Sequence, residues 1–322
     1  MIEGNNFILD TFGSMLKSGR LAHSFLIYGE KGLGKKEIAM YMAQALLCEK
    51  NTGIPCGKCR SCKNASAKSH PDLIFPEKSG KLETYSVETC RYVRTDSYVK
   101  PNDGERKVYV FSDCSDIQTA AQNAMLKIIE EPPDYAYFIF TAESKEVFLP
   151  TILSRVISLP ATLCTENECA RILEDRGFDR EQIKEACLSF GSNAGMCIEY
   201  IQNENLRNTV ALTRKAAESI IKRDEYDFLV AAADPLLKDR GAALMFLRML
   251  DNIIRDSVVC KINPEMSFAG CSKKAARELS ERLSVSSAVR IHKFIASAAD
   301  DISSNVNVSL IFSALCGEIM GY

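Results

Sequence analysis

The stretch LIYGEKGLGKKEIA, residues 26–39, joins a short apolar run to a glycine-rich turn and then to a helical pattern. A phosphate-binding loop follows the pattern G-x-x-x-x-G-K-[ST], in which backbone N–H groups and the lysine contact phosphate while the final hydroxyl holds magnesium. Gly29, Gly34 and Lys35 fit this pattern, but Lys36 stands at the hydroxyl position. The stretch therefore predicts the strand, turn and helix that open an α/β domain, with an altered metal-binding position.

The turn formed by Gly29, Gly32, Gly34 and Lys35 has two possible explanations. It is either a tight strand-to-helix connection or the descendant of a nucleotide site. The preceding strand and following helix favour descent, because a helix N-terminus with free N–H groups attracts phosphate. Function is a separate question, since Lys36 offers magnesium no neutral oxygen and adds a positive charge beside the cation.

A nucleotide-hydrolysing site also needs an acidic side chain directly after a later strand, because that acid holds the magnesium ion. The segment KVYVFSDCSD, residues 107–116, contains the candidate strand end. Ser112 follows the apolar run where the metal-holding aspartate is expected, and Asp113 stands where a catalytic glutamate is usual. Two independent metal-binding elements are thus altered. We predict no ATP hydrolysis by this chain and weak or absent ATP binding.

Compact apolar runs alternate with helical patterns through the first half of the chain. Between two of the runs, apolar residues recur at helical spacing from Ile117 to Ile129, and Pro132-Pro133 stops that helix. Near-continuous apolar strands separated by helices predict a parallel sheet covered on both faces. We therefore expect an α/β domain at residues 1–160. Its apolar runs lie at 22–28, 71–77, 106–112, 135–142 and 155–160.

Helical patterns replace strand patterns in the rest of the chain. TENE, residues 165–168, has the form of a capping box that opens a helix. Longer helical patterns follow at 206–223 and 242–259. We expect a small helical domain at 161–205 and a larger all-α domain at 206–322.

The composition is that of a globular protein, with 46% hydrophobic and 25% charged residues in 322. The net charge of −2 provides no overall attraction to nucleic acid, so contact with DNA would have to be local or supplied by partners. No apolar run reaches the roughly 20 residues that cross a bilayer. The N-terminal residues lack the basic start and apolar core of a signal peptide. We expect a cytoplasmic location without membrane contact.

Four of the thirteen cysteines form one compact motif. In CEKNTGIPCGKCRSC, the residues Cys48, Cys56, Cys59 and Cys62 follow a C-x7-C-x2-C-x2-C spacing. Four thiolates on a short loop suit tetrahedral zinc, and four protein ligands leave no open position for catalysis. Isolated redox chemistry and chance grouping are the alternatives. The spacing predicts a structural zinc site.

The remaining cysteines carry no such pattern. An odd total in a long chain without an export signal favours thiols and metal over disulfides. We expect the other nine to be small core or surface thiols. His70 lies eight residues after Cys62 and directly before Pro71, and we expect it to pack or cap and not to bind metal.

The segment LPTILSR, residues 149–155, places Arg155 between a helical pattern and a strand. A lone arginine at such a point is ordinarily a solvated surface charge. It could also reach a neighbouring subunit's nucleotide and stabilise charge on the transferring phosphoryl group. The residues alone leave both possibilities open.

These motifs together resemble the bacterial DNA polymerase III clamp-loader subunits, a branch of the AAA+ family. The resemblance is densest over 20–160, weaker beyond, and covers nearly the whole chain. It combines the four-cysteine loop with RLAHSFLIYGEKGLGKK (20–36), HPDL (70–73), ERKVYVFSD (105–113), AQNAMLKIIEEPP (121–133) and LPTILSRV (149–156).

Within that family, the delta-prime type is the most similar. The ATPase subunits, gamma/tau, keep the P-loop hydroxyl and the acidic pair that this chain lacks at Lys36 and Ser112. The delta subunit generally lacks the cysteine loop and the S-R-C signature. This chain departs from that signature at Val156, and its cysteine loop is one residue shorter than is common.

The resemblance implies an architecture and a role. The first domain would be a RecA-like AAA+ domain with an inserted zinc module at 48–62, followed by a helical lid at 161–205 and a collar at 206–322. The chain would be a non-hydrolysing, stator-like member of a hetero-pentamer with gamma/tau and delta. Arg155 would act in trans as an arginine finger, and Ser154 would position the helix end beside it.

That assembly is part of the DNA polymerase III holoenzyme, a nucleotidyltransferase complex, and it places the sliding clamp on primer-template DNA. Two alternatives remain. One is an ATP-hydrolysing gamma/tau-like subunit, which an intact hydroxyl at position 36 would have favoured. The other is a stand-alone zinc-containing nucleic-acid-binding protein, which would need aromatic residues among the lysines of the cysteine loop. No aromatic residue lies between Tyr41 and Phe75.

Overall fold

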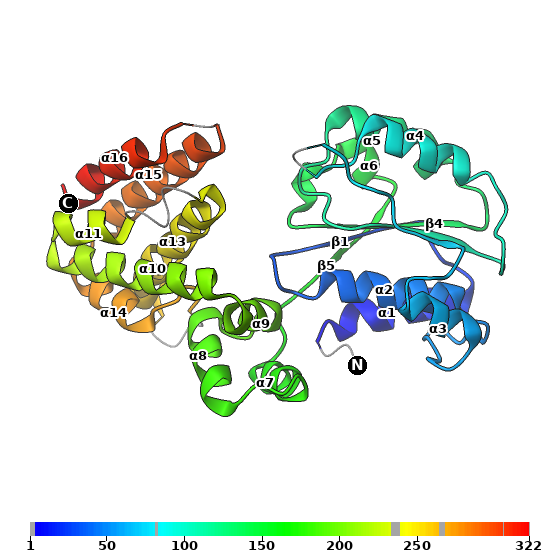
Figure 1. The fold of residues 1–322 in the computed structure, drawn as a ribbon, viewed down its shortest axis with the longest axis horizontal. Helices are drawn as coiled ribbons and strands as arrows, with labels where there is room; N and C mark the ends of the chain where they lie inside the picture. The colour runs from blue at the N-terminus through cyan, green and yellow to red at the C-terminus, as the bar shows by residue number, and fades with distance from the viewer. Residues whose placement is uncertain (1–3, 81–82, 233–238, 264–267, 305, 322) are drawn as a thin grey trace. The chain divides into compact units, whose positions relative to one another are not determined.

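The chain folds into two compact units, residues 1–168 and 169–322. A computed structural model describes residues 4–80, 83–232, 239–263, 268–304 and 306–321. Each unit has its own arrangement of elements (Figure 1). None of the helices within these described ranges combines the length and the apolar character that crossing a membrane requires.

The first unit is built on a five-stranded sheet in the order β2-β3-β4-β1-β5. All four strand pairings are parallel, as predicted. β3 and β4 are buried along their whole length, which explains their uninterrupted apolar runs. The strands are β1 (Ser24–Tyr28), β2 (Leu73–Ile74), β3 (Lys107–Phe111), β4 (Ala136–Ala142) and β5 (Ile157–Pro160).

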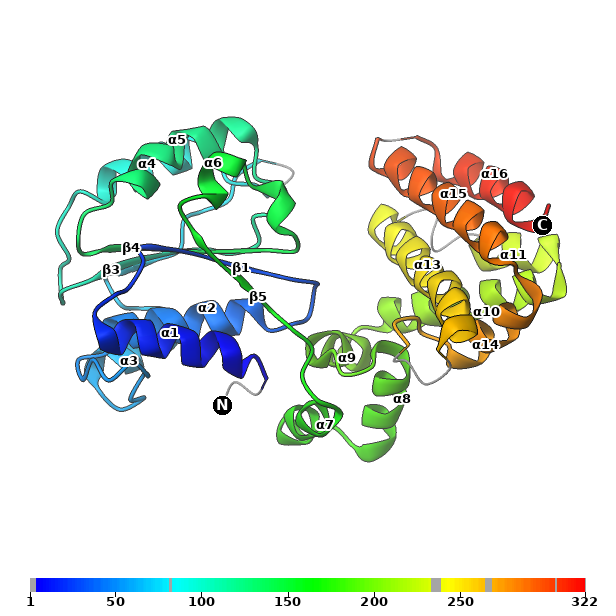
Figure 2. The ribbon, with the colours of Figure 1, turned by 180° about the vertical axis from the view of Figure 1, so that it is seen from behind.

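Helices cover both faces of this sheet. α1, α2 and α3 lie on one face, and α4, α5 and α6 lie on the other (Figures 1 and 2). A separate apolar core fills each side, because successive strand residues point to opposite faces. The helices are α1 (Asn6–Ser18), α2 (Lys35–Leu47), α3 (Arg60–Ser66), α4 (Val87–Asp96), α5 (Thr119–Glu130) and α6 (Pro150–Leu153), with a 3₁₀ turn η1 (Lys145–Val147) before α6.

Helices alone make up the described part of the second unit, and α7 spans the junction between the units. α13 packs against α10, α14 and α15 and buries Phe246, Leu250 and Ile253. The helices are α7 (Glu166–Asp175), α8 (Arg180–Phe190), α9 (Ala194–Gln202), α10 (Glu204–Lys222), α11 (Glu225–Ala232), α13 (Arg240–Ile262), α14 (Lys273–Arg282), α15 (Val285–Ser303) and α16 (Val308–Met320).

The sequence signals for individual helices are confirmed. The capping box at Thr165 and Glu168 forms, with the Glu168 amide donating to Thr165 Oγ1 at 3.2 Å and the Thr165 amide donating to Glu168 Oε2 at 2.8 Å. The helical patterns at 206–223 and 242–259 match α10 and α13 to within three residues at each end. The division of the helical part into a lid and a collar stays a prediction.

Candidate functional site

The glycine loop lies where β1 ends and α2 begins, at the carboxyl edge of the sheet. Gly29, Gly32 and Gly34 all have positive φ values, of 148°, 88° and 75°. At Gly29 a Cβ atom would lie 2.8 Å from the carbonyl oxygen of Ala161, so the close approach of the chain after β5 requires glycine there.

The Lys35 side chain folds back onto the backbone of the glycine loop. Its Nζ donates to the carbonyl oxygens of Gly29 at 2.6 Å and Glu30 at 2.7 Å. Lys36, the next residue, is exposed in the first turn of α2. The lysine that would reach a phosphate is therefore engaged with the backbone of its own loop, and its neighbour supplies no hydroxyl.

The end of β3 carries the residues at the expected acidic positions. The Ser112 carbonyl oxygen accepts a hydrogen bond from the Tyr85 hydroxyl at 2.9 Å. Asp113 has a φ of 56°, and its carboxylate pairs with Lys78 at 3.5 Å. This carboxylate is half exposed. Asp113 is the only acidic residue within two residues of the end of β3, and it is already paired with a cation.

Arg155 follows α6 and is held by three neighbours. Its guanidinium pairs with Glu130 at 3.0 Å and donates to the Thr151 carbonyl oxygen at 2.8 Å and to Ser154 Oγ at 3.0 Å. Ser154 Oγ also donates to the Thr151 carbonyl oxygen at 3.0 Å. Ser154 Oγ thus contacts both the last turn of α6 and the Arg155 guanidinium. The arginine side chain stays 40% exposed, so a partner could reach it.

The glycine loop and Arg155 lie at opposite edges of the sheet. β5 runs parallel to β1 with Ile157 beside Phe25, so Arg155 falls at the amino edge, near the start of β1. The loop begins after Tyr28 at the carboxyl edge, on the order of 15 Å away along the strands. The structure therefore does not bring these two predicted site elements together within one chain.

Gln122 lies within the segment AQNAMLKIIEEPP, but its positioning role was not predicted. It is buried in α5, and its Nε2 donates to the carbonyl oxygens of Ile117 at 3.1 Å and Val147 at 2.8 Å. Its Oε1 accepts from the Leu149 amide at 2.8 Å. These bonds fix the segment that leads into α6. A polar residue on the apolar face of a predicted helix is the signal that could have identified it.

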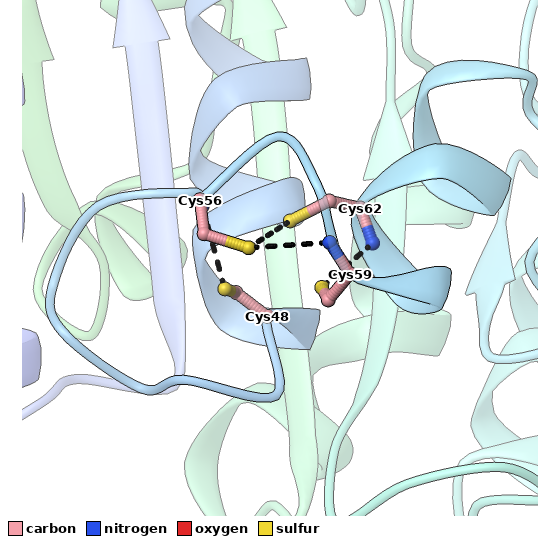
Figure 3. A group of neighbouring side chains, drawn as sticks. All are labelled: Cys48, Cys56, Cys59 and Cys62. Atoms are coloured by element: carbon pink, nitrogen blue, oxygen red, sulfur yellow. Dashed lines mark hydrogen bonds between the residues drawn. The ribbon is translucent and has the colours of Figure 1, made fainter.

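The four predicted cysteines converge at the end of α2 and the start of α3 (Figure 3). Cys48 follows α2, Cys59 caps α3, and all four sulfurs lie within 4.8 Å of one another. Three backbone amides point at sulfur: Cys56 N–H donates to Cys48 Sγ at 3.4 Å, Cys59 N–H to Cys56 Sγ at 3.4 Å, and Cys62 N–H to Cys59 Sγ at 3.3 Å. Such amides stabilise thiolates.

The thiols differ in their surroundings. Backbone N–H groups of Lys58 and Cys59 lower the pKa of Cys56 to about 6. Burial raises the pKa of Cys62 to about 12. A protein with this arrangement releases protons when a cation converts the buried thiols to thiolates.

The donor set fits a tetrahedral thiophilic ion. Cys56 Sγ and Cys62 Sγ are 3.9 Å apart, close to the roughly 3.8 Å edge that Zn–S bonds of about 2.3 Å produce in a tetrahedron. His70 lies outside this group, and its buried Nδ1 accepts a hydrogen bond from the Asp72 amide at 3.1 Å. That is the packing role predicted for it.

A second group of thiols was not predicted. Cys169, Cys187 and Cys197 come from α7, α8 and α9, and their sulfurs also lie within 4.8 Å of one another. They are separated by stretches of 17 and 9 residues without a metal-type spacing. Their meeting depends on the packing of three helices, which no local pattern records.

The chain is similar to DNA polymerase III subunits. A family model described as DNA polymerase III, delta subunit, matches residues 4–162. A delta-prime subunit of Bacillus subtilis (strain 168) is 25% identical over 257 residues, covering 78% of this chain and 76% of the relative. A gamma/tau subunit of Mycobacterium tuberculosis (strain ATCC 25618 / H37Rv) is 32% identical over 181 residues, covering 55% of this chain.

The match to the gamma/tau relative spans 31% of that protein's length. Among solved structures, a gamma subunit-related protein from Thermotoga maritima aligns with 97% of this chain and 98% of its own, at 16% identity and a TM-score of 0.47.

Proposed function

The chain belongs to the delta-prime clamp-loader family of bacterial DNA polymerase III, and from that premise we propose that it is a non-hydrolysing subunit that completes the ATPase site of a neighbour. The neighbour would be a gamma/tau subunit in a ring that also contains delta. The ring would load the sliding clamp onto primer-template DNA. This role requires an arginine that faces outward and a loop that needs no magnesium.

The position of Arg155 is the observation that carries the proposal. It lies at the amino edge of the sheet, on the order of 15 Å along the strands from its own glycine loop. An arginine there is too far away to act on a nucleotide in its own loop, but its exposed guanidinium could stabilise charge on a nucleotide bound by an adjacent subunit. Its pair with Glu130 is exposed on both sides, and such pairs contribute about 0–1 kcal/mol, so exchange for phosphate is inexpensive.

The glycine loop supports the non-hydrolysing part of the proposal. Lys35 is bonded to the carbonyl oxygens of Gly29 and Glu30, Lys36 replaces the magnesium-binding hydroxyl, and Ser112 replaces the acid after β3. Each change removes a different contact to magnesium or phosphate. Weak or absent ATP binding, without turnover, is the expected behaviour.

The zinc assignment belongs to the same proposal. Cys48, Cys56, Cys59 and Cys62 would hold one structural Zn²⁺ and tie α2 to α3. When bound, the ion supplies a cross-link and no chemistry toward substrate.

The 32% identity to a gamma/tau subunit favours a second candidate function, that of an ATP-hydrolysing subunit. The experiment that follows distinguishes the two candidates.

The test is DNA-stimulated ATP turnover by the loader reconstituted from the source organism. The complex would contain the unaltered chain, its Arg155→Ala form, or an Arg91→Ala control, because Arg91 is another exposed arginine and lies on α4. We expect the Arg155→Ala complex to lose the share of ATP turnover that comes from the site Arg155 completes, because a finger can contribute ~10³-fold at its own site while other sites keep their fingers. The Arg91→Ala complex should hydrolyse ATP at the rate of the unaltered complex.

The chain alone should turn over no ATP. Turnover by the isolated chain would support the ATP-hydrolysing candidate. An Arg155→Ala complex that assembles and hydrolyses ATP at the unaltered rate would show that this arginine is a surface charge.

A further inference from the structure

Three consecutive helices of the second unit each direct one cysteine to a common point. Cys169 is on α7, Cys187 on α8 and Cys197 on α9, and their three sulfurs lie within 4.8 Å of one another. Cys169 and Cys197 are buried, while Cys187 is partly exposed. Six further cysteines of the described chain belong to neither thiol group. The convergence is thus specific to these three.

We propose that Cys169, Cys187 and Cys197 form a second zinc site, in which three thiolates hold the ion and water completes its coordination. Zinc held by thiolates at about 2.3 Å places sulfurs about 3.8 Å apart. Sulfurs already within 4.8 Å of one another reach that arrangement by movements of about 1 Å or less. Side-chain rotation without backbone rearrangement is enough for such a movement.

The backbone around the cysteines favours the thiolate form. Cys169 is the fourth residue of α7, and Cys197 is the fourth residue of α9. The first turn of a helix carries partial positive charge and stabilises a thiolate. Cys197 Sγ lies 3.6 Å from the Gly191 carbonyl oxygen, to which it donates as a thiol. Zinc binding would release that proton and the protons of the other two thiols to solvent, leaving a bound group with one net negative charge.

Ordinary packing of cysteine as a small apolar residue is the competing explanation. It accounts for Cys169 and Cys197, which are buried, but less well for Cys187, which water reaches. The partial exposure instead provides a route for an ion and a place for its water ligand. Measurements on Cys187 therefore distinguish a zinc site from ordinary packing of cysteine in an apolar core.

A metal ion would also stabilise helices that bury few apolar side chains. α7 buries only Cys169 and Leu173, and α9 buries Met196, Cys197 and Tyr200. Small modules with few buried side chains commonly depend on a metal or another cross-link. One ion bound to all three helices would fix α7 against α8 and α9. The expected ligand is Zn²⁺, because thiolates select it over the harder divalent cations.

The experiment measures zinc in the full chain after reconstitution with Zn²⁺ under reducing conditions and removal of unbound metal. The unaltered chain should retain about two zinc ions, one for each thiol group. Cys187→Ser and Cys56→Ser should each retain about one, and the double variant none. The control Cys260→Ser, which alters a partly exposed cysteine outside both groups, should retain both ions.

A second measurement needs no variant and so does not depend on correct folding of one. Alkylation of Cys187 in the unaltered chain, followed by mass spectrometry, should be slowed about tenfold or more when Zn²⁺ is present, because a metal-bound thiolate is blocked. Equal labelling with and without Zn²⁺ would overturn the proposal. One zinc ion in the unaltered chain that Cys187→Ser leaves unchanged would also overturn it.

Discussion

At the scale of single residues, Gln122 links the chain's two most distinctive segments. It sits in the segment AQNAMLKIIEEPP and holds the backbone that enters LPTILSR through Val147 and Leu149. We predict that Gln122→Ala lowers the free energy of unfolding by about 2 kcal/mol, because three hydrogen bonds of this buried side chain, one fully and two partly buried, are lost and their backbone partners stay unpaired. Chemical denaturation of the isolated chain measures this change.

The matched control for this prediction is the N-cap residue of the same helix. Gln118 precedes α5, is exposed and makes no side-chain cap, so Gln118→Ala should change stability by less than about 0.5 kcal/mol. Gln122→Ala should also reduce ATP turnover of the reconstituted loader, since α6 carries Ser154 and Arg155. A Gln122→Ala chain as stable as the Gln118→Ala chain would contradict the positioning role.

At the scale of elements, the loop between β1 and α2 contains two adjacent lysines with different surroundings. Lys35 donates to the carbonyl oxygens of Gly29 and Glu30, whereas Lys36 is exposed. We predict that Lys35→Ala destabilises the nucleotide-free chain by about 1 kcal/mol, the contribution of partly exposed hydrogen bonds. Lys36→Ala should leave stability unchanged within about 0.5 kcal/mol.

The comparison is internally controlled, because both substitutions remove a positive charge from the first turn of α2 and so change the helix-dipole interaction alike. Thermal unfolding of the two variants without nucleotide is the measurement. Equal stability of the two variants would mean that Lys35 does not hold the loop closed in the free chain.

Much of the first unit could be predicted because its signals are local. The apolar runs at 106–112 and 135–142 contain β3 and β4, and Pro132-Pro133 follows α5 as expected. β2 is the exception, since only Leu73–Ile74 form strand within the run at 71–77. Pro71 and Pro76 flank that pair, and proline has no N–H with which to extend a ladder.

The candidate sites also differ in whether local sequence predicts them. Cys48, Cys56, Cys59 and Cys62 lie within one loop, so their spacing alone predicted that their sulfurs would meet, and they do. The meeting of Cys169, Cys187 and Cys197 and the hydrogen bonds of Gln122 both depend on which helix faces pack together. Helix packing depends on many side chains far apart in the chain, so no local sequence pattern predicts these contacts.

At the scale of the whole molecule, the two units each contain their own apolar core, so damage to one need not spread to the other. Cys56→Ser tests this, because the four-cysteine group belongs to the first unit and joins α2 to α3. We predict that this variant loses one zinc ion and that amide hydrogen exchange accelerates about tenfold or more at the end of α2 and in α3, since local stability there depends on the metal.

Exchange in α10 and α13, which lie in the second unit, should stay as in the unaltered chain. Hydrogen-exchange mass spectrometry resolves the two units, and Cys260→Ser serves as the control that should preserve both the zinc content and the protection of α3. Unchanged zinc content in Cys56→Ser would remove the basis for the first metal site. Equal loss of protection in α3 and α13 would instead show that the chain unfolds as one cooperative body, because local opening confined to one unit leaves the other protected.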